Sequence, residues 1–138
     1  MKRPSVLVIE NNYLDIFIIR ALIGKYIDVY VVKNFEEAIK INAKFNFSIV
    51  LVDTGTYNHQ ADNLNLRILK ASGKNQDLKV CSITGCRGNI EEFKKRFDHS
   101  FSKPVTKDEI FDFLDWELPQ LSLSKTIQPR TRQLAAIF

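Results

Sequence analysis

Four short runs of apolar residues, separated by longer segments with a helical pattern, constrain the fold of this chain most strongly. The runs are nearly continuous and cover residues 6–9, 29–32, 49–52 and 80–83, and three of them are rich in β-branched residues. Strands that are buried on both faces of a sheet have this character. The pattern therefore predicts a parallel sheet whose strands alternate with helices, with right-handed crossovers and helices on both faces.

Five amphipathic segments between and after these runs predict five helices. Their apolar residues recur at intervals of three and four, which places them on one face of each helix. The residues that we expect to face the core are Leu14, Phe17, Ile18, Ala21 and Leu22; Phe35, Ala38, Ile39 and Ala43; Ala61, Leu64, Ile68 and Leu69; Ile90, Phe93 and Phe97; and Ile110, Phe113, Leu114 and Leu118.

Three of the helix starts are also marked by capping boxes. Asn34, Asn89 and Thr106 each stand three residues before a glutamate, a spacing in which the two side chains bond reciprocally to free backbone N–H groups. A short fifth strand fits at residues 100–102. The expected fold is thus a doubly wound α/β unit of five strand–helix pairs, (βα)5, over residues 4–118.

The chain is long enough for one domain. Its charge and hydropathy limit the kinds of partner that we expect. Its 138 residues do not suffice for two full domains. No apolar run approaches the roughly 18 residues of a membrane span, and the first run is too short for a signal peptide, so we expect a cytoplasmic protein without a membrane partner. Three of the four net positive charges lie in residues 119–138. Three cations make few phosphate contacts, so nucleic acid is not expected as a partner.

The division of the chain follows from these patterns. Residues 1–118 form the expected domain, and residues 119–138 form a C-terminal tail. The tail keeps no sustained period but contains many apolar residues, among them Leu121, Leu123 and Phe138. We expect it to be partly docked, on its own domain or on a partner subunit, or else disordered.

Polar residues follow four of the five predicted strands at the point where each strand ends. They are Glu10 with Asn11, Asp53, Thr84 and Lys103. Ligands of open α/β sheets bind outside the carboxyl ends of the strands. Two carboxylates, a hydroxyl and an ammonium group are therefore expected to converge on one edge of the sheet.

At this point the chain resembles the receiver domain of two-component response regulators. The matching stretches are residues 6–12, 49–53, 80–85 and 101–104, in the order and spacing of that family. The resemblance implies a flavodoxin-like fold of three layers with strand order 2-1-3-4-5. It also implies that Asp53 is the phosphoacceptor and that Thr84 and Lys103 contact the phosphoryl oxygens.

By the same resemblance, Mg²⁺ is held by Glu10, Asn11, Asp53 and the backbone carbonyl of Gly55. Carboxylate, carbonyl and water oxygens are the ligands that Mg²⁺ prefers, and a divalent ion and a lysine together neutralise the charges that meet during phosphoryl transfer. The expected partners are a histidine kinase or phosphotransfer protein, and a downstream protein bound on the face formed by the fourth helix, fifth strand and fifth helix.

The sequence also departs from the family pattern at three places. Asn11 stands where a second carboxylate is usual, so Mg²⁺ binding should be weak. The loop after Asp53 lacks the usual proline and glycine, and Ser100 replaces the aromatic residue that normally switches position. Phe101, the next residue, is expected to point into the core.

Two hypotheses for the function stay open. The first is a stand-alone response regulator receiver that accepts a phosphoryl group on Asp53 in a phosphorelay and signals by protein–protein contact. The second is a pseudo-receiver interaction module that works without phosphorylation. Neither is an enzyme, and the sequence lacks the G-x-x-x-x-G-K-[ST], G-x-G-x-x-G and G-x-S-x-G motifs of nucleotide-binding proteins and hydrolases.

Overall fold

The computed structural model describes residues 3–56, 59–85 and 90–123, and its centre is a parallel five-stranded sheet. All four neighbouring strand pairs are parallel, and the strand order is β2-β1-β3-β4-β5. This is the order expected from the sequence. The strands are β1 (Ser5–Ile9), β2 (Asp28–Val32), β3 (Ile49–Asp53), β4 (Lys79–Thr84) and β5 (His99–Ser102).

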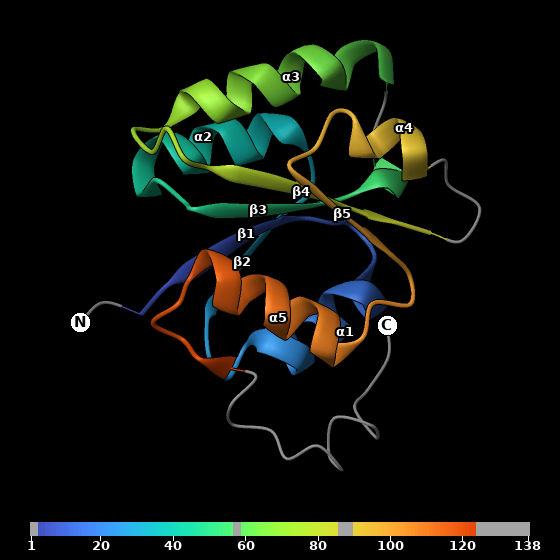
Figure 1. Cartoon of the computed structure of the whole chain (residues 1–138). Coiled ribbons are helices and arrows are strands. Elements are labelled where there is room, and N and C mark those ends of the chain that lie inside the picture. Colours follow the sequence, from blue (N-terminus) through green and yellow to red (C-terminus); the bar gives the residue numbers. More distant parts are fainter. Residues whose placement is uncertain (1–2, 57–58, 86–89, 124–138) are drawn as a thin grey trace.

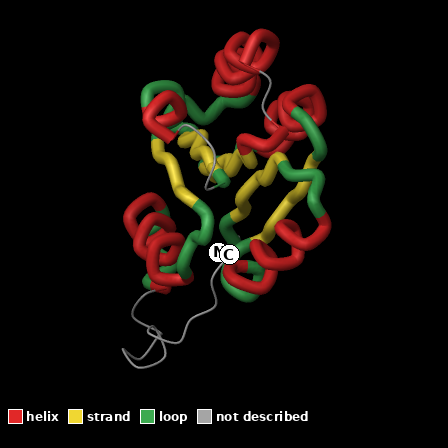
Figure 2. The backbone as a smooth tube through the Cα atoms, turned by 90° about the vertical axis from the view of Figure 1, so that its right-hand side faces the viewer, coloured by secondary structure: helices red, strands yellow, loops and turns green. Residues whose placement is uncertain are grey.

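Five α-helices cover the two faces of this sheet and complete the three expected layers (Figure 1). Helices α2, α3 and α4 lie on one face, and α1 and α5 lie on the other; Figure 2 shows the same layers after a quarter turn. A short 3₁₀ turn, η1 (Thr54–Thr56), follows β3. The helices are α1 (Tyr13–Ile23), α2 (Phe35–Phe45), α3 (His59–Ser72), α4 (Ile90–Lys94) and α5 (Lys107–Glu117).

The core consists of two apolar clusters, one on each face of the sheet. Alternate residues of β1 show the division: Val6 and Val8 belong to the cluster beneath α1 and α5, whereas Leu7 and Ile9 belong to the cluster beneath α2 and α3. Because successive side chains of a strand point to opposite faces, a strand with both faces covered must be apolar throughout. This explains the continuous apolar runs in the sequence.

The helix starts agree with the predicted capping where the structure describes them. Asn34 Oδ1 accepts the N–H of Glu37 at 2.9 Å, and Thr106 Oγ1 accepts the N–H of Glu109 at 3.2 Å. Asn12 caps α1 in the same way, although it was not among the predicted caps. The cap predicted at Asn89 lies outside the described residues.

The predicted core face of α1 is wrong for most of its residues. Leu14 and Phe17 are 65% and 68% exposed, and the buried residues of the helix are Ile19, Leu22 and Ile23. The helix is apolar almost all round, so several faces satisfy the same helical period and the sequence alone could not select one. An apolar surface, formed by Tyr13, Leu14 and Phe17, is therefore left open beside the start of the helix.

The predicted core face is also partly wrong in α3, and in α2 it is wrong only at its last residue. In α3, the predicted Leu69 and also Leu66 are buried, while Leu64 and Ile68 are exposed. In α2 the buried residue near the C-terminal end is Asn42, not Ala43. The Asn42 amide has polar partners, since its Nδ2 donates to Ser72 Oγ at 2.9 Å and its Oδ1 accepts the N–H of Phe47 at 2.9 Å. The polar side chain of Asn42 thus links α2 to α3.

The first residues after α5 pack back onto the domain. Leu123 is 1% exposed and Leu121 is packed against the cluster beneath α1 and α5. The N–H of Leu123 donates to the side chain of Asp115 on α5. Residues 124–138, the rest of the predicted tail, lie outside the described residues.

Candidate functional site

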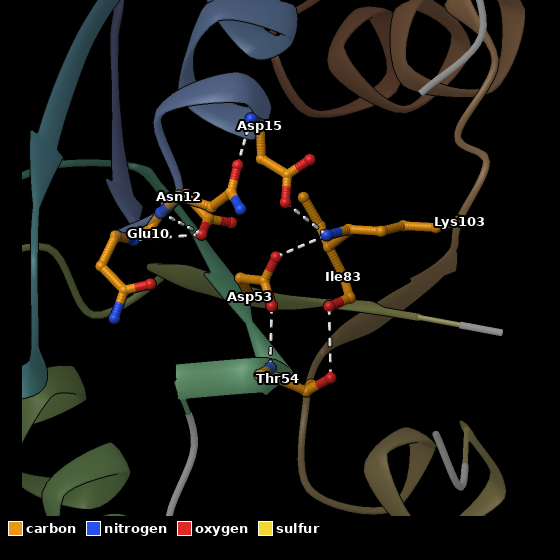
Figure 3. A network of polar contacts seen from close by, with 9 residues as sticks. Glu10, Asn12, Asp15, Asp53, Thr54, Ile83 and Lys103 are labelled. Atoms are coloured by element: carbon orange, nitrogen blue, oxygen red, sulfur yellow. Dashed lines mark hydrogen bonds and ion pairs between the residues drawn. The ribbon is translucent and has the colours of Figure 1, made fainter. Parts of the chain in front are cut away.

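Asp53 and Lys103 form an ion pair at the carboxyl edge of the sheet (Figure 3). Asp53 is the last residue of β3, and Lys103 directly follows β5. The Lys103 Nζ donates to Asp53 Oδ2 at 2.7 Å, and the N–H of Gly55 donates to Asp53 Oδ1 at 2.7 Å. Both carboxylate oxygens are therefore held by donors, and the side chain is only 11% exposed.

Glu10 lies beside Asp53, at the end of β1. Its side chain is buried, and its Oε1 accepts the N–H groups of Asn11 and Asn12, each at 3.0 Å. A carboxylate oxygen of Glu10 also lies within 4.8 Å of one of Asp53. Two acidic groups in contact inside a buried edge cannot both carry a full charge without cost, so one of them holds a proton.

The pKa shifts of this pair indicate which group holds the proton. Burial and the hydrogen bond to Asp53 raise the pKa of Glu10 to about 7. Burial also raises the pKa of Asp53, but hydrogen bonds from Glu10, Lys103 and the Gly55 amide outweigh it and lower that pKa below the ordinary value. Asp53 is therefore the ionised member, which is the form that a nucleophile needs.

Asp15, on the first turn of α1, is a third carboxylate at this edge. Lys103 Nζ lies 2.9 Å from Asp15 Oδ2, so the lysine bridges Asp15 and Asp53. Burial lowers the pKa of Lys103, but its bonds to Asp53 and Asp15 dominate and raise it. One carboxylate oxygen of each of Glu10, Asp15 and Asp53 lies within 4.8 Å of the others.

Asp15 was missed in the sequence analysis, although a signal for it exists. It follows Asn12 at the spacing of a helix cap, and the N–H of Asp15 donates to Asn12 Oδ1 at 3.0 Å. The helix therefore begins directly after Asn12, and this start carries the Asp15 side chain back to the strand edge (Figure 3). An acidic residue is common on the first turn of a helix because it interacts favourably with the helix dipole. The spacing alone therefore did not mark Asp15 as a site residue.

Thr84 is buried at the end of β4, and its Oγ1 has no hydrogen-bond partner among the described residues. Its backbone carbonyl accepts the N–H of Lys103 at 2.8 Å, so the two residues adjoin. A buried hydroxyl without a partner costs free energy, and such a group is a common mark of a ligand position. The hydroxyl fits an anionic oxygen placed beside Lys103.

The structure brings together Glu10, Asp53 and Lys103 of the predicted site, with Gly55 one hydrogen bond from Asp53 and Thr84 beside Lys103. Asn11 is exposed, and its backbone N–H bonds to Glu10. The metal-binding and phosphoryl-binding roles of these residues stay predictions.

Strand β5 has the side-chain directions expected from the sequence. Phe101 is 4% exposed and packs edge-on against Phe113 of α5. Ser100 points to the other face, where its hydroxyl bonds to that of Ser82 on β4 at 2.7 Å. Ser100, with the small hydroxyl group of Ser82 beside it, thus occupies the position at which the family usually has an aromatic switch residue.

This combination of a 2-1-3-4-5 parallel sheet with a carboxylate and a lysine at its carboxyl edge defines a receiver-like α/β protein. Solved structures of receiver domains share the fold. No family model and no curated protein sequence matches the chain.

Three of the similar structures illustrate the likeness. The receiver domain of a sensor histidine kinase from Pseudomonas aeruginosa, with magnesium coordinated in its active site cleft, matches with a TM-score of 0.70 and 16% identity, over 86% of this chain and 99% of that one. A response regulator from Thermotoga maritima matches with a TM-score of 0.68 and 16% identity, over 86% of this chain and 99% of that one. The signal receiver domain of a diguanylate cyclase from Desulfovibrio desulfuricans matches with a TM-score of 0.68 and 22% identity, over 89% of this chain and 99% of that one.

The receiver-domain fold that the sequence motifs predicted is therefore confirmed. Identities of this size establish the fold and leave the chemistry to the residues of this chain. None of the helices in the described part of the chain is long and apolar enough to span a membrane.

Proposed function

We propose that this chain is a response regulator receiver that accepts a phosphoryl group on Asp53 from a histidine kinase or phosphotransfer protein. The observation that carries the proposal is the position of Asp53 between the Lys103 ammonium, 2.7 Å away, and the Glu10 carboxyl. These contacts keep Asp53 ionised inside a largely buried edge, as a carboxylate nucleophile requires.

In the proposed transfer, an oxygen of Asp53 forms a bond to phosphorus while the P–N bond to the donor histidine breaks. The electron pair of that bond stays on the imidazole, which takes up a proton from water. Lys103 balances negative charge on the phosphoryl oxygens, and the Thr84 hydroxyl, which has no partner among the described residues, donates a hydrogen bond to one of them.

Mg²⁺ fits the donors at this edge. The cluster of carboxylate oxygens from Glu10, Asp15 and Asp53 offers the hard oxygen ligands that Mg²⁺ prefers, and the resemblance to receivers adds the backbone carbonyl of Gly55. When bound, the ion would neutralise charge on the incoming phosphoryl group. Asn11 contributes no charge of its own, so with Glu10 and Asp53 alone the site should bind Mg²⁺ weakly.

Two surfaces suit the protein partners. The exposed apolar surface of Tyr13, Leu14 and Phe17 adjoins Asp15 and suits the protein that brings the phosphoryl group. On β5 and α5, a cleft of about 750 Å³ is lined in part by His99, Phe113 and the exposed Trp116. An aromatic cleft of this kind suits a downstream protein target.

The proposal is tested by incubating the protein with acetyl phosphate and Mg²⁺ and measuring its intact mass. We expect a mass increase of one phosphoryl group in the wild type and none in Asp53→Asn, with circular dichroism confirming that both are folded. Removing Mg²⁺ with a chelator should prevent the increase. An unmodified wild-type mass under these conditions would reject phosphorylation on Asp53.

A pseudo-receiver interaction module is the second candidate function. Asn11 in place of a carboxylate and the small hydroxyl pair at Ser82 and Ser100 favour it, because they weaken the metal site and the usual switch. In this case Asp53 would stabilise the fold through Lys103. The same mass measurement separates the two functions, since an interaction module remains unmodified.

A further inference from the structure

The geometry points to Asp15 as the third carboxylate ligand of Mg²⁺ at this edge, supplied by α1 in place of the carboxylate that the chain lacks at Asn11. This inference rests on the proposed function, because it assigns a ligand of the same metal site. It concerns a residue that the sequence motifs did not single out.

The position of Asp15 supports this assignment. A carboxylate oxygen of Asp15 lies within 4.8 Å of oxygens of both Glu10 and Asp53. Two oxygens on opposite sides of an octahedral Mg²⁺ are about 4 Å apart, because each bond measures about 2 Å. Small rotations of side chains therefore suffice to place all three carboxylates around one ion.

Asp15 also has a carboxylate oxygen that no described residue contacts by a hydrogen bond. Its Oδ2 accepts from Lys103, whereas its Oδ1 accepts no hydrogen bond from the described residues. The side chain is about three-quarters buried, and its backbone is held by the Asn12 cap. Asp15 thus presents an oxygen that is positioned in advance and available to a cation.

The number of carboxylates supports the same assignment. Glu10 and Asp53 alone give the edge two carboxylates, and Asp15 brings the count to three. The buried Thr84 hydroxyl, unpaired among the described residues, independently marks this edge as a place for a ligand, and its neighbour Lys103 contacts both Asp15 and Asp53.

Asp15 could instead act only by holding Lys103 in place, and the experiment must separate these roles. A residue that acts through the lysine loses its effect when the lysine is removed, whereas a metal ligand keeps it. The Lys103→Met background therefore distinguishes a ligand from a positioning residue.

The experiment is titration calorimetry of the full chain with Mg²⁺ alone. The variants are Asp15→Asn, Asp53→Asn and Lys103→Met, with Asp108→Asn on the first turn of α5 as the matched control. We expect Asp15→Asn to weaken Mg²⁺ binding by about tenfold or more, since even the outer partners of metal ligands have effects of that size. The same factor should persist in Lys103→Met, and Asp108→Asn should bind as the wild type does.

Each outcome decides the assignment. Rescue of the Asp15→Asn affinity by a second change, Asn11→Asp, would support the replacement of one carboxylate by the other. Unchanged binding in Asp15→Asn, with binding lost in Asp53→Asn, would overturn the role of Asp15 and leave the proposed function standing. No Mg²⁺ binding by the wild type would overturn both, and an Asp15 effect that vanishes in Lys103→Met would make Asp15 a positioning residue only.

Discussion

The hydroxyl groups of Ser82 and Ser100 lie 2.7 Å apart and join β4 to β5. Ser82 is fully buried and stands two residues before Thr84 on the same strand. Neither serine is large enough to fill the space that Thr84 would leave on moving toward a phosphoryl group. If the chain works as the proposed receiver, we therefore expect reduced coupling between the site and the β5 face.

The first prediction follows from this pair. Binding of beryllofluoride and Mg²⁺, which imitates phosphorylation, should change amide exchange near Asp53 but change it little across residues 90–103. Hydrogen-exchange mass spectrometry of the free and bound protein measures this. A large and localised change in that segment would contradict the role given to Ser100.

The second prediction concerns Asn11. Its replacement by aspartate adds a full negative charge next to Glu10, so Asn11→Asp should raise both the Mg²⁺ affinity and the yield of phosphorylated Asp53. Calorimetry and intact mass measure the two effects, and Asp53→Asn should abolish phosphorylation in either background. Restored metal binding without any phosphorylation would favour the interaction module.

The third prediction concerns the pH dependence of stability. The pKa of Glu10 is about 7 in the folded protein and has its ordinary value, 4.5, when unfolded. The folded state thus binds more protons between these values, and the Glu10 contribution to stability falls as the pH rises through this window. Glu10→Gln imitates the protonated form and should not show this fall. Over this pH window the wild type should therefore lose on the order of 1–3 kcal/mol more of its free energy of unfolding than the variant.

Urea unfolding at pH 5 and pH 7.5, in the presence of a chelator, measures this contribution as the difference between wild type and variant. Other groups titrate in the same window, but they do so in both proteins and cancel in the comparison. An equal pH dependence in the two proteins would show that Glu10 is ionised throughout.

The fourth prediction concerns the segment after α5. Leu123 is buried against the core beneath α1 and α5, so Leu123→Ala should reduce the free energy of unfolding by about 2–4 kcal/mol. Leu64→Ala on the exposed side of α3 is the matched control and should cost far less. Truncation after Leu118 should lower Tm at least as far as Leu123→Ala, and an unchanged Tm would count against this packing.

The sheet could be predicted from the sequence because its strands are covered on both faces. Such strands must be apolar throughout, as residues 49–52 are, and few other elements of a small α/β domain require so short and continuous an apolar run. The polar residues that end these strands, such as Glu10 and Asp53, could be predicted for the same reason. Their position in the chain follows directly from where each apolar run stops.

The helix faces and Asp15 could not be predicted in this way. Helix α1 is apolar almost all round, so the choice between Phe17 and Ile19 as a core residue depends on how the helix sits on the sheet. Asp15 reaches the site only because the Asn12 cap sets where the helix begins. Both features depend on the relative placement of elements, which no local pattern contains.

The bridge from Lys103 to Asp15 has a consequence for how the protein unfolds. The two residues are 88 positions apart in the chain, yet they meet at 2.9 Å. Their meeting requires the first helix and the last strand to be in place, so this edge exists only in the fully assembled domain. A ligand of the edge, such as the proposed Mg²⁺, would bind the native state alone and stabilise it by mass action. Titrating Mg²⁺ should therefore shift the thermal transition of the domain as a single cooperative unit, with no separate loss of the site at lower temperature.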